Sequence, residues 1–315
     1  MPVTQRLPTF LETVPALLSH LKIKHIHIAS QSSGTLFALN LLALNPSLLS
    51  PTDPSITLFS PWVHQSLTGV SFLLAASKLP DFMLNHWASL TGFMINSLLP
   101  GLVTSSGAFA SIGNWFAGSN SGAPNNELLT AGDTTSKEAV KAYEERRCLE
   151  VFGVSTEVKA ALEKLVMKYA FTEECSGGND EARLCLKSLS TISWGALEYY
   201  PSYITSLQQA WSKRLAEGSP KLTVRILLAE EDAMIGEKGA EYLQECWTKE
   251  KVGEGVDIEV ITLDGTDHDG VLDPMRGATG EFYRAVKEGR KAFVEEGGEG
   301  GEEEETLQQA LSRSQ

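Results

Sequence analysis

Two parts of the chain alternate apolar and polar residues in patterns that predict strands and helices. In the first part, apolar residues at helical spacing predict a helix over 6–21, which Pro15 is expected to kink. Alternating isoleucine and histidine then predict a strand over 24–29. Residues 35–44 are apolar on almost every side, which indicates a helix buried on every side. A second strand is predicted at 55–59, between two prolines.

The second part lies far downstream and repeats this alternation. The run 223–229 is apolar except for Arg225, a pattern typical of a strand covered on both faces. A helix is predicted over 239–249 and a last strand over 258–263. Strands that alternate with helices predict a mostly parallel sheet and the α/β fold class.

The long segment between these parts has no strong strand pattern and begins almost without charge. From residue 54 to residue 126, only Lys78 and Asp81 are charged. Polar residues interrupt the apolar stretch 82–116, so it falls short of a transmembrane helix. We interpret it as buried cap helices, with an apolar, lipid-facing lid as the alternative. Further helices are predicted over 137–151, 156–172, 180–189 and 202–216.

The charge of the chain excludes some partners. The 315 residues include 40 acidic and 26 basic ones, a net charge of -14, which disfavours nucleic acids and anionic membrane surfaces. Seven of the acids fall in the glycine- and glutamate-rich run 295–305, so residues 295–315 are predicted to form a disordered acidic tail.

The cysteines and the N-terminal sequence predict a reduced, cytoplasmic protein. The four cysteines have no metal-ligand spacing and are too sparse for a disulfide scaffold. The first twenty residues lack the pattern of a signal peptide. No zinc, nucleotide or NAD motif occurs, so neither a cofactor nor a metal is expected.

A short polar turn between the first strand and the buried helix is the strongest candidate for chemistry. In the turn 30–34, Ser32 has small residues two places before and after it, Ser30 and Gly34. This small-x-Ser-x-Gly spacing between a strand and a helix is typical of a nucleophile elbow. A nucleophile at Ser33 would put larger residues at both places, so Ser32 is preferred. The backbone N–H of Ser33 would then be one oxyanion donor.

A nucleophilic serine needs a base and an orienting acid, which in this motif follow in that chain order: serine, acid, histidine. The loop after the third predicted strand contains Asp232, and the loop after the fourth contains His268. Glu230 or Glu231 could be the acid instead, and Asp232 could simply cap the next helix. His268 could also be a solvated loop residue or a weak cation ligand.

Three further residues are candidates for contact with a substrate. Gln31 adjoins the proposed nucleophile, and Trp62 and His64 follow the second strand. His25 and His27 precede the elbow on its strand, where packing or solvent exposure is the simpler interpretation.

These pieces together resemble the α/β-hydrolase superfamily, in its serine-hydrolase form with an inserted cap, and are similar to uncharacterised fungal members. The resemblance implies a hydrolase core at 1–65 and 199–294, a helical cap at 66–198, and strands equivalent to the fifth to eighth of that fold. It rests on the segments RLPTFLETVPALLSHLKI, HIHIASQSSGTLFALNLL, SITLFSPWV, ILLAEEDAMI and TLDGTDHDGVL.

The same resemblance exposes a departure and leaves two functions open. The first four strands of such hydrolases, and the loop that supplies the second oxyanion donor, have no counterpart here, so a truncated chain with a bare edge at the elbow strand is expected. Loss of one donor typically lowers turnover by ~100- to 1,000-fold. The sequence therefore predicts either a hydrolase of apolar carboxylic esters that acts through an acyl-enzyme on Ser32, or an impaired remnant that binds a small apolar ligand or a protein. An acyl transferase would use the same acyl-enzyme.

Overall fold

The structure is a computed structural model, and it describes residues 1–84, 134–170, 176–276, 278–280, 282–283 and 286–287. The acidic tail 295–315 and most of the apolar stretch 82–116 lie outside these residues, so both interpretations stay predictions. The described residues contain no helix that is long and apolar enough to cross a membrane.

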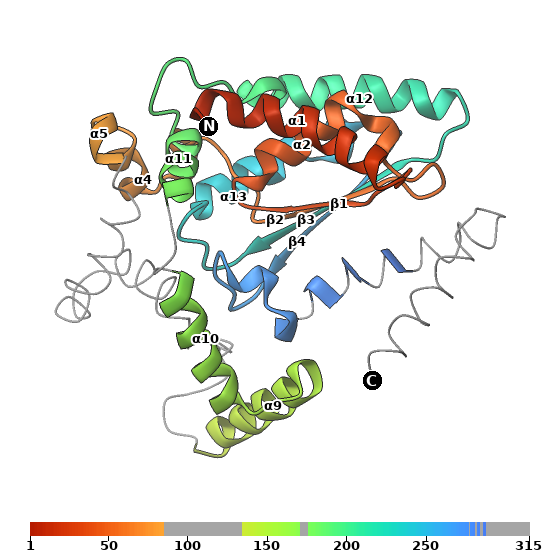
Figure 1. Cartoon of the computed structure of the whole chain (residues 1–315). Coiled ribbons are helices and arrows are strands. Elements are labelled where there is room, and N and C mark those ends of the chain that lie inside the picture. The colour runs from red at the N-terminus through yellow and green to blue at the C-terminus, as the bar shows by residue number, and fades with distance from the viewer. Residues whose placement is uncertain (85–133, 171–175, 277, 281, 284–285, 288–315) are drawn as a thin grey trace.

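The centre of the fold is a four-stranded parallel sheet in the order β1-β2-β3-β4 (Figure 1). The strands are β1 (Ile28–Gln31), β2 (Ser55–Phe59), β3 (Leu222–Ala229) and β4 (Val256–Leu263). This arrangement confirms the predicted α/β class. Because all strands run the same way, the loops that follow them meet at one edge of the sheet.

The strand boundaries differ from prediction mainly at β1. The N–H of Ile26 donates to Leu48 O (2.8 Å), outside the sheet, so regular pairing begins only at Ile28 and then continues to Gln31. In the described part of the chain, β1 pairs with β2 alone and β4 with β3 alone. Buried and exposed residues alternate along most of β4, as is typical of a strand at a sheet edge.

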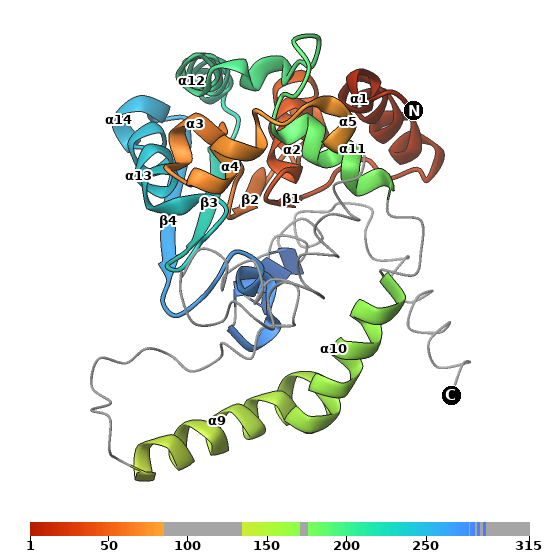
Figure 2. The same cartoon turned by 90° about the vertical axis from the view of Figure 1, so that its left-hand side faces the viewer.

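Helices cover one face of the sheet and form the main core with it. They include α1 (Val3–His20), α2 (Gly34–Leu44), α12 (Tyr200–Ala216) and α13 (Gly236–Cys246) (Figures 1 and 2). The α2 helix is buried nearly all round, as predicted, and packs on β1. The α1 helix continues through Pro8 and Pro15 as one element.

The remaining helices connect the core elements or lie in the segment 66–198, for which a helical cap stays a prediction. Figures 1 and 2 place α9 and α10 on the opposite side of the sheet from α1 and α12. The α11 helix ends at Cys185 rather than at the predicted residue 189, because Lys187 has a left-handed backbone (φ 47°) that cannot continue a helix. The bounds are α3 (Gln65–Thr68), α4 (Ser71–Ala76), α5 (Asp81–Leu84), α9 (Thr134–Phe152), α10 (Thr156–Ala170), α11 (Ser176–Cys185) and α14 (Lys249–Val252), with 3-10 turns at Pro46–Leu48, Gly195–Glu198, Gly270–Leu272 and Pro274–Arg276.

A buried amide connects α2 to the segment that enters α12. The side chain of Asn40 donates to Leu36 O (2.6 Å) and Trp194 O (2.9 Å), and its carbonyl accepts from the N–H of Ala196 (2.8 Å). Between these two partners, Gly195 has a φ of 60°, and a Cβ there would lie 2.3 Å from Asn40 Oδ1. The turn therefore needs both the amide and the glycine.

We expect Asn40→Leu to lower the free energy of unfolding by about 1–3 kcal/mol, because leucine has a similar volume but leaves the N–H of Ala196 without its partner and removes one of the two donors to Trp194 O. Urea denaturation at equilibrium measures the change. Thr205→Val on the exposed side of α12 is the control and should stay within about 0.5 kcal/mol. Equal effects of the two variants would contradict the assignment.

Candidate active site

The turn between β1 and α2 has the strained geometry of a nucleophile elbow. Ser32 has a φ of 50°, in the left-handed region that side chains other than glycine rarely adopt. A Cβ on Gly34 would lie 3.3 Å from the Cβ of Ser30, so any larger residue at either position would crowd the turn. This contact is the physical reason for the small residues on both sides of Ser32.

Hydrogen bonds to the next loop hold this strained turn. The N–H of Ser32 donates to Phe59 O (3.0 Å) at the end of β2. The carbonyl of Ser32 accepts from the N–H groups of Thr35 (3.0 Å) and Trp62 (3.1 Å). The backbone of Ser32 is thus fixed at both its donor and its acceptor.

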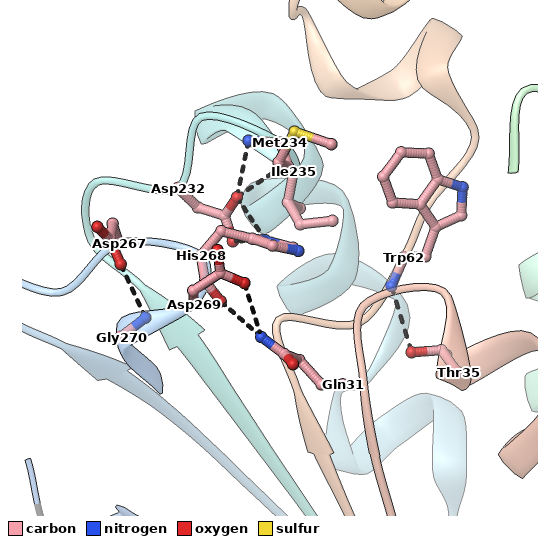
Figure 3. A network of polar contacts seen from close by, with 10 residues as sticks. All are labelled: Gln31, Thr35, Trp62, Asp232, Met234, Ile235, Asp267, His268, Asp269 and Gly270. Atoms are coloured by element: carbon pink, nitrogen blue, oxygen red, sulfur yellow. Dashed lines mark hydrogen bonds and ion pairs between the residues drawn. The ribbon is translucent and has the colours of Figure 1, made fainter. Parts of the chain in front are cut away.

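Asp232 and His268 form a buried pair beside this turn (Figure 3). His268 Nδ1 lies 2.9 Å and 2.8 Å from the two carboxylate oxygens of Asp232. Their side chains are only 8% and 5% exposed. Asp232 Oδ1 also accepts from the N–H groups of Met234 (2.9 Å) and Ile235 (2.7 Å), so one carboxylate both orients the imidazole and caps the turn before α13.

The neighbouring acidic residues hold the same loops together but do not pair with His268. Glu230 Oε2 accepts from the N–H of Gly265 (2.7 Å), and the N–H of Glu231 donates to Thr266 O (3.0 Å). Of the three acids in this loop, the structure therefore brings Asp232 to the histidine.

The pair shifts the pKa values of its two members in opposite directions. Burial alone would raise the pKa of Asp232, but the hydrogen bond and charge of His268, the N–H of Ile235 and the nearby Ser60 hydroxyl lower it overall. Burial likewise disfavours a charged His268, but Asp232, followed by Asp269 and Asp267, raises the pKa of the imidazole above its ordinary value.

The imidazole points from Asp232 toward the side of the site where the elbow turn and Trp62 lie (Figure 3). With Nδ1 engaged by Asp232, Nε2 is the nitrogen that remains for a proton from the elbow. Within the described residues, no hydrogen bond joins the hydroxyl of Ser32 to His268. Such contacts commonly tighten only when substrate binds.

The start of α2 supplies a favourable position for negative charge. Ser33 is the N-cap of this helix, where the helix dipole and unpaired N–H groups favour an anion. The hydroxyl of Ser33 donates to Glu181 Oε1 of α11 (2.6 Å), and Arg6 of α1 lies 3.5 Å from the other oxygen of Glu181. The α11 helix thus reaches the residue next to the proposed nucleophile.

The three predicted substrate contacts occupy different positions. The amide nitrogen of Gln31 donates to the His268 loop, which places it within the site. Trp62 is buried, and its indole N–H donates to Cys185 O (3.3 Å). His64 caps α3, and its ring centroid lies 5.5 Å from that of Trp194 with the two rings tilted by 59°. Burial, aided by Lys187, lowers the pKa of His64. A substrate contact stays a prediction for each of them.

The structure also adds two residues that sequence reasoning did not select. Ser60 is fully buried at the end of β2 with a φ of 41°, although the following proline normally favours an extended backbone. Asp269 accepts a hydrogen bond from Gln31. In the sequence, the position of Asp269 next to His268 was the only indication that it could belong to the site.

No group of three or more potential ligands in the described residues could hold a metal ion.

Comparisons with known proteins find no matching family model and no matching curated protein. Solved structures do match. A putative non-heme bromoperoxidase of Mycobacterium tuberculosis is 12% identical over 87% of this chain and 71% of its own, with a TM-score of 0.39. A carboxylesterase of the thaumarchaeon Nitrososphaera gargenis is 15% identical over 92% and 73%, also at 0.39. An α/β hydrolase from a deep-sea metagenome is 15% identical over 86% and 70%, again at 0.39.

The parallel sheet, the turn after β1, and the acid and histidine in the loops after β3 and β4 agree with the arrangement that the resemblance to α/β hydrolases implies. At 12–15% identity and TM-scores below 0.5, the matched structures add no argument of their own. Similarity to fungal members stays a prediction.

We expect Asp232→Asn to reduce stability most at mildly acidic pH. The raised pKa of His268 stabilises the fold below about pH 6.5, and this contribution is lost as the pH rises through the folded-state value. The lowered pKa of Asp232 stabilises it above about pH 3.9, and this contribution is lost as the pH falls through the folded-state value. Asparagine keeps an oxygen for the N–H groups of Met234 and Ile235, so the variant isolates the pair.

Urea denaturation of both proteins across this range measures the difference. The loss should be about 1.5–3 kcal/mol near pH 5 and smaller near pH 8.5. A loss that does not change with pH would contradict the charged pair.

Proposed function

We propose that this protein is a serine hydrolase that cleaves carboxylic esters through an acyl-enzyme on Ser32. The observation that carries the proposal is the buried Asp232–His268 pair, which lies beside a strained elbow whose residue at positive φ is a serine. Nucleophile, base and acid follow one another along the chain in the order that this motif requires.

Each group has a defined part in the reaction. Ser32 Oγ attacks the ester carbonyl while His268 Nε2 takes its proton, and Asp232 stabilises the imidazolium that results. The N–H of Ser33 stabilises the oxyanion of the tetrahedral intermediate. His268 then gives the proton to the departing alkoxide, which leaves as the alcohol.

The second half of the reaction regenerates the enzyme. His268 takes a proton from water, the hydroxide attacks the acyl carbon, and the proton returns to Ser32 as the carboxylic acid departs. An alcohol in place of water would give acyl transfer with the same groups. The near absence of charge from residue 54 to residue 126 supports an apolar acyl group as the preferred substrate.

We expect a fluorophosphonate probe to label Ser32, because an activated serine displaces fluoride from phosphorus as it would displace an alkoxide from an ester. Peptide mass spectrometry locates the adduct. Ser32→Ala should abolish labelling and lower turnover of 1-naphthyl butyrate by at least about 1,000-fold.

The neighbouring serine provides the matched control. Ser33→Ala keeps the backbone N–H and removes only the hydroxyl bound to Glu181, so labelling should persist. If the folded wild-type chain shows no adduct on Ser32, the nucleophile is not activated, and binding of an apolar ligand or a protein becomes the better hypothesis.

We also expect kcat/KM for 1-naphthyl butyrate to rise with pH along a limb whose midpoint lies above about 6.5. His268 accepts a proton only when neutral, and its raised pKa moves this form to higher pH. Initial rates between about pH 5 and pH 9 measure the limb. A midpoint well below the ordinary histidine value would mean that His268 is not the base.

A further inference from the structure

We propose that Gln31 is a positioning residue that holds the His268 loop at a set distance from the nucleophile elbow. This inference rests on the proposed hydrolase function, because it assigns a role in aligning the base with Ser32. It does not require Gln31 to touch the substrate.

The contacts that carry the inference span the site. Gln31 Nε2 donates to the carbonyl oxygen of His268 at 3.1 Å and to Asp269 Oδ1 at 3.3 Å (Figure 3). The two partners belong to adjacent residues of one loop, and one of them is the candidate base itself. Gln31 is separated from them by more than two hundred residues of sequence.

The chemistry of the amide suits these two partners. An amide nitrogen has two N–H groups, so Gln31 can donate to both acceptors together. A carbonyl and a carboxylate only accept, so the amide oxygen could not take the place of the nitrogen. Neither glutamate nor leucine could make these contacts.

The two hydrogen bonds from Gln31 to the His268 loop form a clamp. The backbone on the Gln31 side of this clamp is held by strand pairing. Gln31 is the last residue of β1 and pairs with Phe59 of β2, and the next residue is the strained Ser32. The side chain therefore joins the paired end of β1, next to the elbow, to the loop of the base. The first part of that loop is held separately. Gly265 and Thr266, which precede His268, form hydrogen bonds with Glu230 and Glu231.

The clamp also holds a negative charge near the base. The charged groups that face His268 are Asp232 from the loop after β3 and Asp267 and Asp269 from its own loop. Partial desolvation, together with Asp267 and Asp232, raises the pKa of Asp269 to about 6, against the opposing effects of His268 and the Gln31 N–H. By donating to Asp269, Gln31 favours its ionised form beside the imidazole.

The experiment compares Gln31→Leu, Gln31→Glu and Asp269→Asn with wild type in the full chain. Steady-state rates with 1-naphthyl butyrate give kcat and KM, and NMR titration of the histidines gives the pKa of His268, with His268→Gln to assign its signal. Thermal unfolding reports stability. Glu259→Gln, which breaks a surface pair with Arg225 on β3, is the control and should match wild type.

Gln31→Leu should lower kcat by about 10- to 100-fold with little change in KM, because the base loses its alignment with Ser32. Gln31→Glu should lower kcat at least as much and raise the pKa of His268, because a carboxylate replaces a donor. Asp269→Asn keeps an oxygen for Gln31, so it should lower the pKa of His268 and retain most of kcat. A Gln31→Leu variant with unchanged kcat would overturn the proposal, as would losses of activity that merely follow unfolding.

The readouts separate this inference from the proposed function. The titration of His268 needs only a folded chain, whereas labelling of Ser32 tests the nucleophile. If wild type is unlabelled, the hydrolase proposal fails. The role of Gln31 in aligning the base fails with it, even when the variants shift the His268 titration. If wild type is labelled and the Gln31 variants keep their rates, only the positioning role fails.

Discussion

The buried pair of Asp232 and His268, which is an ion pair when the histidine is protonated, is the interaction on which the candidate site depends. Taking two ionisable groups out of water is unfavourable unless each has partners, and here Asp232 has His268 and two backbone N–H groups. The pair can form because β3 and β4 run parallel and adjacent, which brings the loops after them to one edge of the sheet. The same edge receives the elbow from β1, so the sheet topology brings together three loops that are remote in sequence.

Much of this arrangement could be predicted from the sequence, because most of its elements have a recognisable local sequence pattern. The apolar runs of β2 and β3 are bounded by prolines or polar loops, and the tight elbow requires small residues at positions 30 and 34. The start of β1 was predicted too early, because its limit is set by the capture of the Ile26 N–H by Leu48, a tertiary contact. The Gln31 contacts with the His268 loop have no local pattern at all, since they depend on the register of β1 against distant strands.

The α11 helix contacts the candidate site through a chain of charged and polar groups. Arg6 of α1 pairs with Asp180 at 3.1 Å and with Glu181 at 3.5 Å, and Glu181 accepts from the hydroxyl of Ser33. A carboxylate this close to the start of α2 would oppose an oxyanion at the Ser33 N–H. Arg6 offsets that effect, because its guanidinium lies against the same carboxylate. The position of α11 therefore bears on the electrostatics of the proposed reaction.

Two serines at positive φ show how strain is tolerated where the chemistry is proposed. Each such residue is unfavourable by about 1–3 kcal/mol, and Ser32 and Ser60 stand side by side at the ends of β1 and β2. Their backbones are held by hydrogen bonds to Phe59, Trp62 and Leu227, and α2 packs its buried face directly behind the elbow. The buried packing of α2 against β1 therefore opposes relaxation of the strained turn. The proposed nucleophile is thus held in place by packing that also stabilises the core.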